Sequence, residues 1–323
     1  MITARLPALR ARPAGFATRL ARFADNVFEP KLHTAFAALW SLSLLGNLHA
    51  LHGAPAWRFS ARTPVLVLSV FLCLFFLRMV DEIKDLDYDR VHNPHRPLVA
   101  GLVTRVDIAA YLALFAGIVI GLNAVLGVAL AAWLALDLVY GLAQLPLERV
   151  ARAVRENLFV NLIAVYPVNV ALSVYTLLFF LADGGGTFHS RDAWLIVAYA
   201  CAFLHFELAR KSGWTHLAGP GERLYSQLVG LRGALALSTL FALTALGITL
   251  WLFAPWAHTG AAAVTGWLPL LVLVPACHGL LAFARHRSAR HAARPPAVAF
   301  LFTFYVTMLA HALAATPLVW SAR

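Results

Sequence analysis

The chain has 323 residues, of which 61% are hydrophobic and 13% are charged. Soluble domains are typically about 45–50% apolar and about 25% charged, so this composition excludes an ordinary soluble domain. The formal net charge is +11. It does not indicate a nucleic-acid partner, because the basic residues gather in short connections between apolar runs, as in membrane proteins. The three cysteines lie inside apolar runs, which favours core packing over disulfides or a metal cluster.

Residues 1–32 are basic and rich in alanine, and we expect them to form a separate cytoplasmic N-terminal arm. Apolar residues recur there at helical spacing, at Phe16, Leu20, Phe23 and Val27. This pattern is typical of an amphipathic helix that lies on the membrane surface. Residues 33–323 then form a single transmembrane domain.

The apolar windows that follow predict nine transmembrane helices, because each is close to the length that crosses a hydrocarbon core of about 30 Å. The windows cover residues 33–51, 63–83, 106–122, 125–143, 157–181, 193–211, 231–253, 264–284 and 297–320. The third and fourth are separated only by the step Gly121-Leu122-Asn123, which we interpret as a turn; one long re-entrant unit is the alternative. The predicted fold class is therefore an all-α bundle of nine transmembrane helices.

The distribution of Lys and Arg supports nine helices and orients them. With the N-terminus in the cytoplasm, the arm and the even-numbered connections carry 22 of the 26 basic residues. Cytoplasmic connections of membrane proteins have this excess, and a miscounted helix would destroy the alternation. The sequence thus predicts a multi-pass protein, with a bacterial inner membrane as the expected location. Its longest connections, residues 84–105 and 211–230, both face the cytoplasm.

The densest group of acids follows the second predicted helix, in the run Asp81-Glu82-Ile83-Lys84-Asp85-Leu86-Asp87-Tyr88-Asp89-Arg90. Asp81, Asp85 and Asp89 are four residues apart, so on a continuous helix they form one stripe and repel one another. A bound cation relieves this repulsion, and Mg²⁺ is usually held by one or two carboxylates together with substrate phosphates. We therefore expect Asp81, Glu82, Asp85 and Asp89 to be metal ligands. A solvated acidic cap beside Lys84 and Arg90 is the alternative.

A rigid turn, His92-Asn93-Pro94-His95-Arg96-Pro97, follows the acids and returns Arg96 towards them. A guanidinium there can bind a diphosphate through two parallel hydrogen bonds. A role in orienting the protein in the membrane is the alternative for Arg96.

The segment Asp81–Gly101 resembles the first signature of the UbiA superfamily of intramembrane prenyltransferases, in which an Asp-rich helix end precedes Pro-x-Arg-Pro-Leu and a glycine. The resemblance implies a nine-helix bundle with two cytoplasmic signatures, after the second and sixth helices. It also implies that the carboxylates bind Mg²⁺ and a prenyl diphosphate. The chain resembles a divergent member, since Asp81, Glu82, Asp85 and Asp89 occupy the places of the usual pattern Asn-Asp-x-x-Asp-x-x-x-Asp, with Asp and Glu in the first two.

The second signature is reduced in this chain. Where the family supplies two or three aspartates, the run His205-Phe206-Glu207-Leu208-Ala209-Arg210-Lys211 has one carboxylate. We expect Glu207 to take part in catalysis, and Arg210 and Lys211, on the same helix face, to bind the diphosphate in place of a second metal. An ion-paired helix end is the alternative. The later run Glu222-Arg223-Leu224-Tyr225-Ser226 resembles one found in divergent members.

Other polar residues lie within the predicted helices, where they are functional or join neighbouring helices. Asp137 is deep in the fourth helix, and either a polar substrate group or a neighbouring helix would satisfy it. A set in the fifth helix is a candidate acceptor pocket or interhelical contact: Asn161, Tyr166 and Asn169. Arg149, Arg152 and Arg155 suit an anionic lipid at least as well as a substrate.

The sequence thus favours Mg²⁺-dependent transfer of a prenyl group from a prenyl diphosphate to a small acceptor at the cytoplasmic face. The family resemblance suggests that the acceptor is an aromatic or quinone-precursor ring. Two alternatives remain open: phosphoribosyl or glycosyl transfer onto a polyprenyl phosphate, and an ion-coupled transporter that uses Asp137. We expect membrane lipid to surround the protein. The sequence leaves open the acceptor, the length of the prenyl chain and the regiochemistry of transfer.

Overall fold

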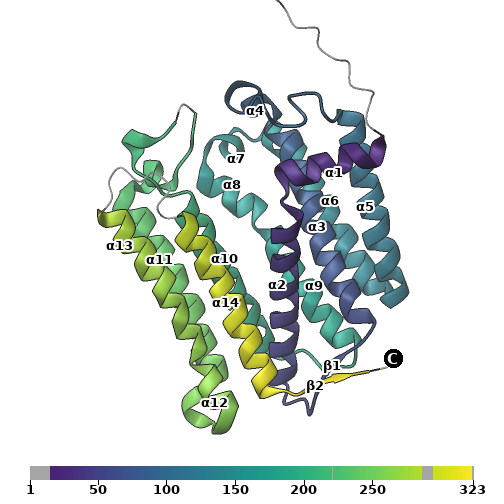
Figure 1. Cartoon of the computed structure of the whole chain (residues 1–323), viewed down its shortest axis with the longest axis vertical. Coiled ribbons are helices and arrows are strands. Elements are labelled where there is room, and N and C mark those ends of the chain that lie inside the picture. The colour runs from purple at the N-terminus through teal and green to yellow at the C-terminus, as the bar shows by residue number, and fades with distance from the viewer. Residues whose placement is uncertain (1–14, 220, 286–293, 322–323) are drawn as a thin grey trace, which may run out of the picture.

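The computed structural model of the protein describes residues 15–219, 221–285 and 294–321. Almost all of this part is helical (Figure 1). The helices are α1 (Phe16–Val27), α2 (Pro30–Leu51), α3 (Arg62–Lys84), α4 (Leu86–His92), α5 (Arg105–Leu126), α6 (Val128–Val150), α7 (Arg152–Glu156), α8 (Leu158–Val165), α9 (Pro167–Ala182), α10 (Ser190–Arg210), α11 (Tyr225–Phe253), α12 (Gly260–Gly266), α13 (Leu273–Arg285) and α14 (Arg294–Ala315). Short 3₁₀ turns cover Thr215–Leu217, Pro255–Ala257 and Leu268–Val272, and two strands are β1 (Trp57–Phe59) and β2 (Leu318–Trp320).

Nine segments of the described chain are long and apolar enough to cross a membrane, which confirms the predicted all-α membrane fold. Two are composite: α8 and α9 share one span that is interrupted before Pro167, and α12, a 3₁₀ turn and α13 share another. Proline lacks the amide hydrogen that a helix interior needs, which explains the interruption at Pro167. α11 changes direction at Gly230, whose φ of +70° suits glycine.

The turn between the third and fourth spans lies at Gly127, and the prediction that placed it at Gly121–Asn123 was wrong. α5 runs on to Leu126 because the Asn123 side chain finds partners within the bundle. Its Nδ2 donates to Ser69 Oγ at 2.8 Å, and its Oδ1 accepts from Tyr175 Oη at 2.7 Å. An asparagine that suggests a turn in the sequence therefore joins three helices, α3, α5 and α9.

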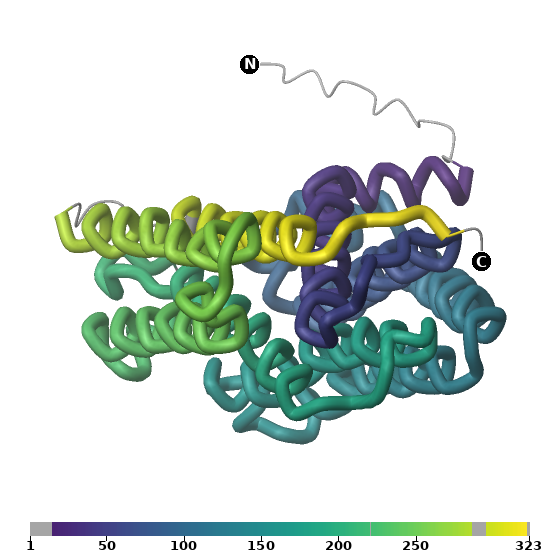
Figure 2. Tube along the Cα trace, turned by 90° about the horizontal axis from the view of Figure 1, so that it is seen from below, coloured from purple at the N-terminus to yellow at the C-terminus, as the bar shows by residue number. Residues whose placement is uncertain are grey.

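The ninth span is shorter than predicted. α14 ends at Ala315, and β2 then pairs in parallel with β1, Trp57 opposite Leu318 (Figure 2). Pro317 disfavours helical geometry at the residue before it, so the apolar run to Trp320 continues as a strand.

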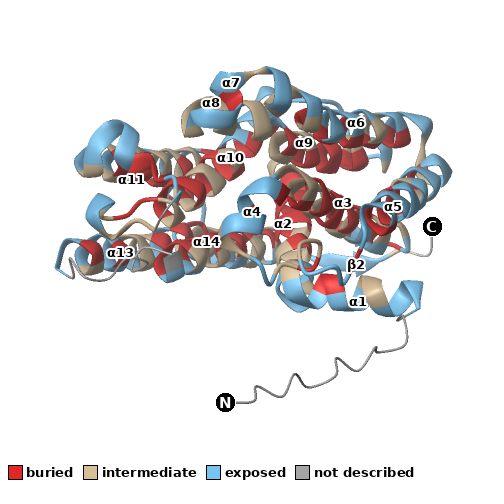
Figure 3. Cartoon of the chain, turned by 90° about the horizontal axis from the view of Figure 1, so that it is seen from above, coloured by how far each residue is buried: buried red, intermediate tan, exposed pale blue. Residues whose placement is uncertain are grey.

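The spans form two groups that face each other (Figure 3). One contains α2, α3, α5, α6, α8 and α9, and the other contains α10 to α14. α14 packs against both α2 and α10 and so joins the groups. Apolar side chains such as Leu136, Ile163 and Val274 are exposed on outward faces, as expected for contact with lipid tails. The connections α1, α4, α7 and residues 211–224 gather at one end of the bundle (Figure 1).

The amphipathic helix predicted in the N-terminal arm is present as α1, but protein covers part of its apolar face. Phe23 is fully buried beside Phe75 of α3, and Phe16 packs against Tyr111 of α5 at 4.6 Å. Arg19 also forms an ion pair with Asp107 at 2.7 Å. The first fourteen residues of the arm, with Arg5, Arg10 and Arg12, lie outside the described part.

Candidate active site

A cavity of about 1580 Å³ opens at the end of the bundle where α1, α4 and α7 lie. Its walls come from both groups of helices and from the 211–224 connection. Apolar side chains line its deeper part: Phe36, Leu74, Leu77, Phe203, Leu301 and Phe302. Charged side chains line its mouth, and they include the predicted residues Asp81, Asp85, Arg96, Glu207, Arg210 and Lys211. The structure therefore brings both predicted signatures to one cavity.

The predicted stripe of acids is divided by a break between α3 and α4. Asp85 lies at the junction, and its ψ of 2° departs from helical geometry. Asp81 and Asp85 line the cavity, whereas Asp89 is only 4% exposed and does not line it. The prediction of one stripe on a continuous helix was thus wrong.

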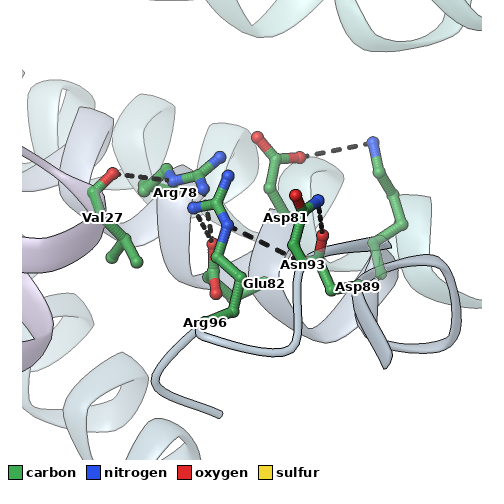
Figure 4. A network of polar contacts seen from close by, with 8 residues as sticks. Val27, Arg78, Asp81, Glu82, Asp89, Asn93 and Arg96 are labelled. Atoms are coloured by element: carbon green, nitrogen blue, oxygen red, sulfur yellow. Dashed lines mark hydrogen bonds and ion pairs between the residues drawn. The ribbon is translucent and has the colours of Figure 1, made fainter. Parts of the chain in front are cut away.

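Glu82 and Asp89 belong to a buried polar network behind the cavity wall (Figure 4). Glu82 is 2% exposed, and its Oε1 accepts from Arg78 Nη2 at 2.5 Å and from Arg96 Nη1 at 3.0 Å. Asp89 Oδ1 accepts from Asn93 Nδ2 at 2.7 Å, and its Oδ2 lies 4.0 Å from Arg96 Nε. These contacts hold the 93–97 turn against the end of α3, as the prolines in the sequence predicted.

Asp81 and Asp85 both line the cavity but differ in their partners. Asp81 lies 3.3 Å from Lys84 Nζ, and Lys84 also lies 3.4 Å from Glu148 on α6. The Asp85 carboxylate forms no ion pair with any residue in the described part of the chain. Its side chain is exposed towards the cavity. Desolvation at this wall, and then the negative charge of Asp81, raise the pKa of Asp85 to about 6.

The reduced second signature forms an ion-paired cluster at the end of α10. Glu207 is 6% exposed and lies 2.5 Å from Arg210 Nη2 and 2.8 Å from Lys211 Nζ. Both cations also line the cavity, and the Arg210 guanidinium lies 5.5 Å from the centre of the Phe206 ring. Glu207 therefore holds two positive groups at the cavity wall.

The 211–224 connection is tied to both groups of helices. Ser226 Oγ donates to Gly213 O at 2.6 Å, and this bond fixes the start of α11 to the backbone that follows α10. Arg223 donates to the Arg155 carbonyl on α7 across the cavity mouth. Gly221, with a φ of +73°, lies against His92 of α4, where an added Cβ would be 2.7 Å from Nε2. Close approach therefore requires glycine here.

The predicted candidate acceptor residues lie in the cavity wall. Asn161, Tyr166 and Asn169 all line it. Two of them also contact protein: Asn161 Nδ2 donates to Glu148 Oε1 at 2.5 Å, and Tyr166 Oη donates to Ala200 O at 2.5 Å. Arg149 and Arg155 line the mouth, whereas Asp137 is 4% exposed and does not line the cavity.

Sequence reasoning missed Arg78, Asn93 and Glu148 as members of this site. Arg78 is four residues before Glu82 on α3, a spacing that favours an ion pair and signalled the contact. Glu148 had no such signal, because it meets Lys84 only through the packing of α6 against α3.

No family model matches the sequence, and no curated protein matches it. The fold, by contrast, matches a solved structure reported for digeranylgeranylglyceryl phosphate synthase in membranes, with a TM-score of 0.60 and 12% sequence identity. The match covers 92% of this chain and 99% of that chain. At 12% identity, this similarity shows a shared fold and no more. The chain therefore has the fold of the UbiA-type intramembrane prenyltransferases, as the resemblance of residues 81–101 predicted.

Proposed function

We infer that the protein is a membrane enzyme that transfers a prenyl group from a prenyl diphosphate to a small acceptor. The observation that carries this proposal is the composition of the large cavity. Its charged lining combines carboxylates, among them Asp81 and Asp85, with the cations Arg96, Arg210 and Lys211, and its depth is apolar. A prenyl diphosphate has the same division between a charged head and an apolar chain.

The donor set at the mouth fits one magnesium ion. No cluster of three or more His, Cys, Asp or Glu side chains in the described chain can hold a metal alone. Mg²⁺ needs only one or two carboxylates when substrate phosphates and waters complete its shell. Asp81 and Asp85, one helical turn apart at the cavity wall, are the proposed ligands. Bound there, Mg²⁺ would neutralise charge on the leaving diphosphate.

The remaining predicted carboxylates have other roles in this proposal. Glu207 already forms ion pairs with two cations, at 2.5 Å and 2.8 Å, so its negative charge is neutralised by the protein itself. Its ion pairs keep Arg210 and Lys211 at the cavity wall and neutralise part of their charge, and both cations face the diphosphate in place of a second metal. Asp89 holds Asn93 and the 93–97 turn.

The chain's own residues then act in three ways. Arg96, Arg210 and Lys211 bind the diphosphate oxygens and stabilise the charge that develops as the bond to the prenyl carbon breaks. The apolar walls, including Phe203 and Phe302, hold the chain and exclude water from the allylic cation. The acceptor attacks that cation beside the wall formed by Asn161, Tyr166 and Asn169.

The proposed substrate entrance is on the cytoplasmic side. The mouth lies at the end that carries α1, α4, α7 and the 211–224 connection (Figure 1). These segments belong to the N-terminal arm and the even-numbered connections, which together hold 22 of the 26 lysines and arginines in the sequence, and such an excess marks cytoplasmic connections. A bacterial inner membrane remains the proposed location.

The test is an assay of the purified protein in lipid nanodiscs. Geranyl, farnesyl and geranylgeranyl diphosphates are supplied with a panel of aromatic acids and of glycerol phosphates, with Mg²⁺ or with EDTA. We expect Mg²⁺-dependent release of diphosphate together with a prenylated product of one acceptor class. A protein that binds none of the three diphosphates would contradict the proposal.

A further inference from the structure

Glu82 occupies a metal position in the signature that the sequence resembles, but its surroundings are those of an ion-pair anchor. The side chain is 2% exposed and does not line the cavity. Its Oε1 accepts from two guanidiniums, Arg78 at 2.5 Å and Arg96 at 3.0 Å. Its Oε2 is buried and has no hydrogen-bond partner among the described residues, so the whole carboxylate is enclosed by protein and would have to move to reach a metal at Asp81 and Asp85.

Arg78 is fixed on its other side by the N-terminal arm. Its Nε donates at 3.0 Å to the carbonyl of Val27, the last residue of α1 (Figure 4). The residues that join α1 to α2, from Asn26 to Glu29, line the cavity themselves. Arg78 therefore connects this wall of the cavity to Glu82.

Arg78 and Arg96 both line the cavity, and Arg96 is the member of this chain of contacts that the 93–97 turn carries. Its guanidinium is partly exposed, and Nη1 is held by Glu82 while Nε lies 4.0 Å from Asp89. The backbone around it is fixed as well, since Arg96 N donates to Asn93 O at 3.0 Å. Two of its nitrogens are thus oriented by protein, which leaves Nη2 to meet a ligand in the cavity.

We propose that Glu82 and Arg78 are positioning residues that fix the Arg96 guanidinium for diphosphate binding, and that Glu82 is not a metal ligand. The inference rests on the proposed function, because it names how that diphosphate site is built. A guanidinium that is held in place loses less side-chain freedom on binding, so the positioned Arg96 binds phosphate oxygens more tightly. Glu82→Gln removes the negative charge that pairs with Arg78 and Arg96, and Arg78→Ala removes the link to Val27.

The experiment measures two binding constants in purified full-length protein. Mn²⁺ binding, followed by electron paramagnetic resonance, reports the metal site, and inorganic pyrophosphate binding in the presence of Mg²⁺, followed by calorimetry, reports the anion site. In Glu82→Gln we expect a Kd for Mn²⁺ within about twofold of wild type and a Kd for pyrophosphate raised about tenfold, which corresponds to about 1.4 kcal/mol. In Asp85→Asn the Mn²⁺ site itself is expected to be lost.

Arg78 gives a second, independent variant that leaves every carboxylate in place. Arg78→Ala should raise the Kd for pyrophosphate, and Arg78→Lys should recover part of the loss because it can still pair with Glu82. Arg90→Ala is the matched control: Arg90 pairs with Asp87 at 2.9 Å but does not line the cavity. It should change neither constant.

A tenfold or greater loss of Mn²⁺ affinity in Glu82→Gln would make Glu82 a ligand and overturn the inference, as would an unchanged pyrophosphate Kd in Arg78→Ala. If Glu82→Gln does not fold, Arg78→Ala and Arg78→Lys decide. Turnover is a separate measurement: a wild type that binds pyrophosphate but transfers no prenyl group contradicts the proposed function and leaves the positioning role standing. Where turnover is found, the positioning variants should raise KM for the prenyl diphosphate more than they lower kcat.

Discussion

Lys84 on α3 lies 3.4 Å from Glu148 on α6, and this contact crosses the cavity wall between the two helices. The same amino group lies 3.3 Å from Asp81, so Lys84 occupies one side of that carboxylate. Asp85, one turn further on, has no such cation in the described chain. Of the two proposed ligands, Asp85 is therefore the more dependent on a bound metal for its charge balance.

Asp85→Asn should lower kcat/KM for the prenyl diphosphate by about 100-fold or more, equivalent to roughly 2.7 kcal/mol of transition-state stabilisation. The amide keeps the shape of the side chain but not the charge that holds Mg²⁺. Asp87→Asn is the matched control, because the Asp87 carboxylate also lines the cavity but is 92% exposed and pairs with Arg90. Equal activity of the Asp85→Asn variant and wild type would remove Asp85 from the metal site.

Metal affinity should depend on pH through Asp85. Its pKa is raised to about 6, and only the ionised form binds a cation, so the apparent Kd for Mg²⁺ should rise as the pH falls below about 6. Calorimetry at pH 5 and pH 7.5 measures this change, which should be kept in Asp87→Asn because that variant leaves Asp85 in place.

The same raised pKa predicts an opposite trend for the metal-free protein. Between the ordinary pKa of 3.8 and about 6, the folded state binds more protons at Asp85 than the unfolded state does. The free energy of unfolding should therefore fall as the pH rises through this window, and added Mg²⁺ should reverse the loss above about pH 6. Thermal unfolding with and without Mg²⁺ checks the sign.

Glu207→Gln should strengthen anion binding while it weakens the fold. Arg210 and Lys211 would lose the carboxylate at 2.5 Å and 2.8 Å, which leaves two half-buried cations without a partner. Pyrophosphate should then bind more tightly by about tenfold, or about 1.4 kcal/mol, and the apparent Tm should drop unless pyrophosphate is present.

Glu156→Gln is the control for Glu207→Gln, since Glu156 pairs with Arg152 at an exposed site where an ion pair contributes little. A Glu207→Gln variant that binds pyrophosphate more weakly than wild type would show that Glu207 itself helps to hold a metal.

Asp137→Leu should stabilise the protein. Both carboxylate oxygens of Asp137 are buried without a hydrogen-bond partner among the described residues, and an unpaired buried polar group costs about 1–3 kcal/mol. A leucine of similar size removes that cost, so the apparent Tm in detergent should rise, whereas Asp137→Asn should gain less. Unfolding of the Asp137→Leu variant would reveal a partner for this side chain.

The sequence predicted the helices and their order because a helix needs about twenty apolar residues to cross the hydrocarbon core of a membrane. It failed where a single side chain changed the local backbone. Asn123 extended α5 by finding two buried partners, and Pro317 turned an apolar run into a strand. In the site, the prediction that Asp81, Asp85 and Asp89 form one stripe assumed a continuous helix.

The helix ends at Lys84, which turns Asp89 away from the cavity. A spacing rule cannot show such a break, because Asp85 and Leu86 carry no proline or glycine signal. Nor can it show which carboxylates meet arginines from distant segments. Glu82 and Arg96 are fourteen residues apart in the sequence, and their ion pair forms because the chain turns back towards α3.

The most direct test of the metal and diphosphate site is a structure of the protein with Mn²⁺ and a non-hydrolysable prenyl thiodiphosphate, recorded with anomalous scattering. The account predicts one manganese peak between Asp81 and Asp85, with the diphosphate facing Arg96, Arg210 and Lys211, and no peak in the Asp85→Asn variant. A manganese peak at Glu207 would contradict it. So would a prenyl chain that lies outside the cavity, which is lined by α3 and α10.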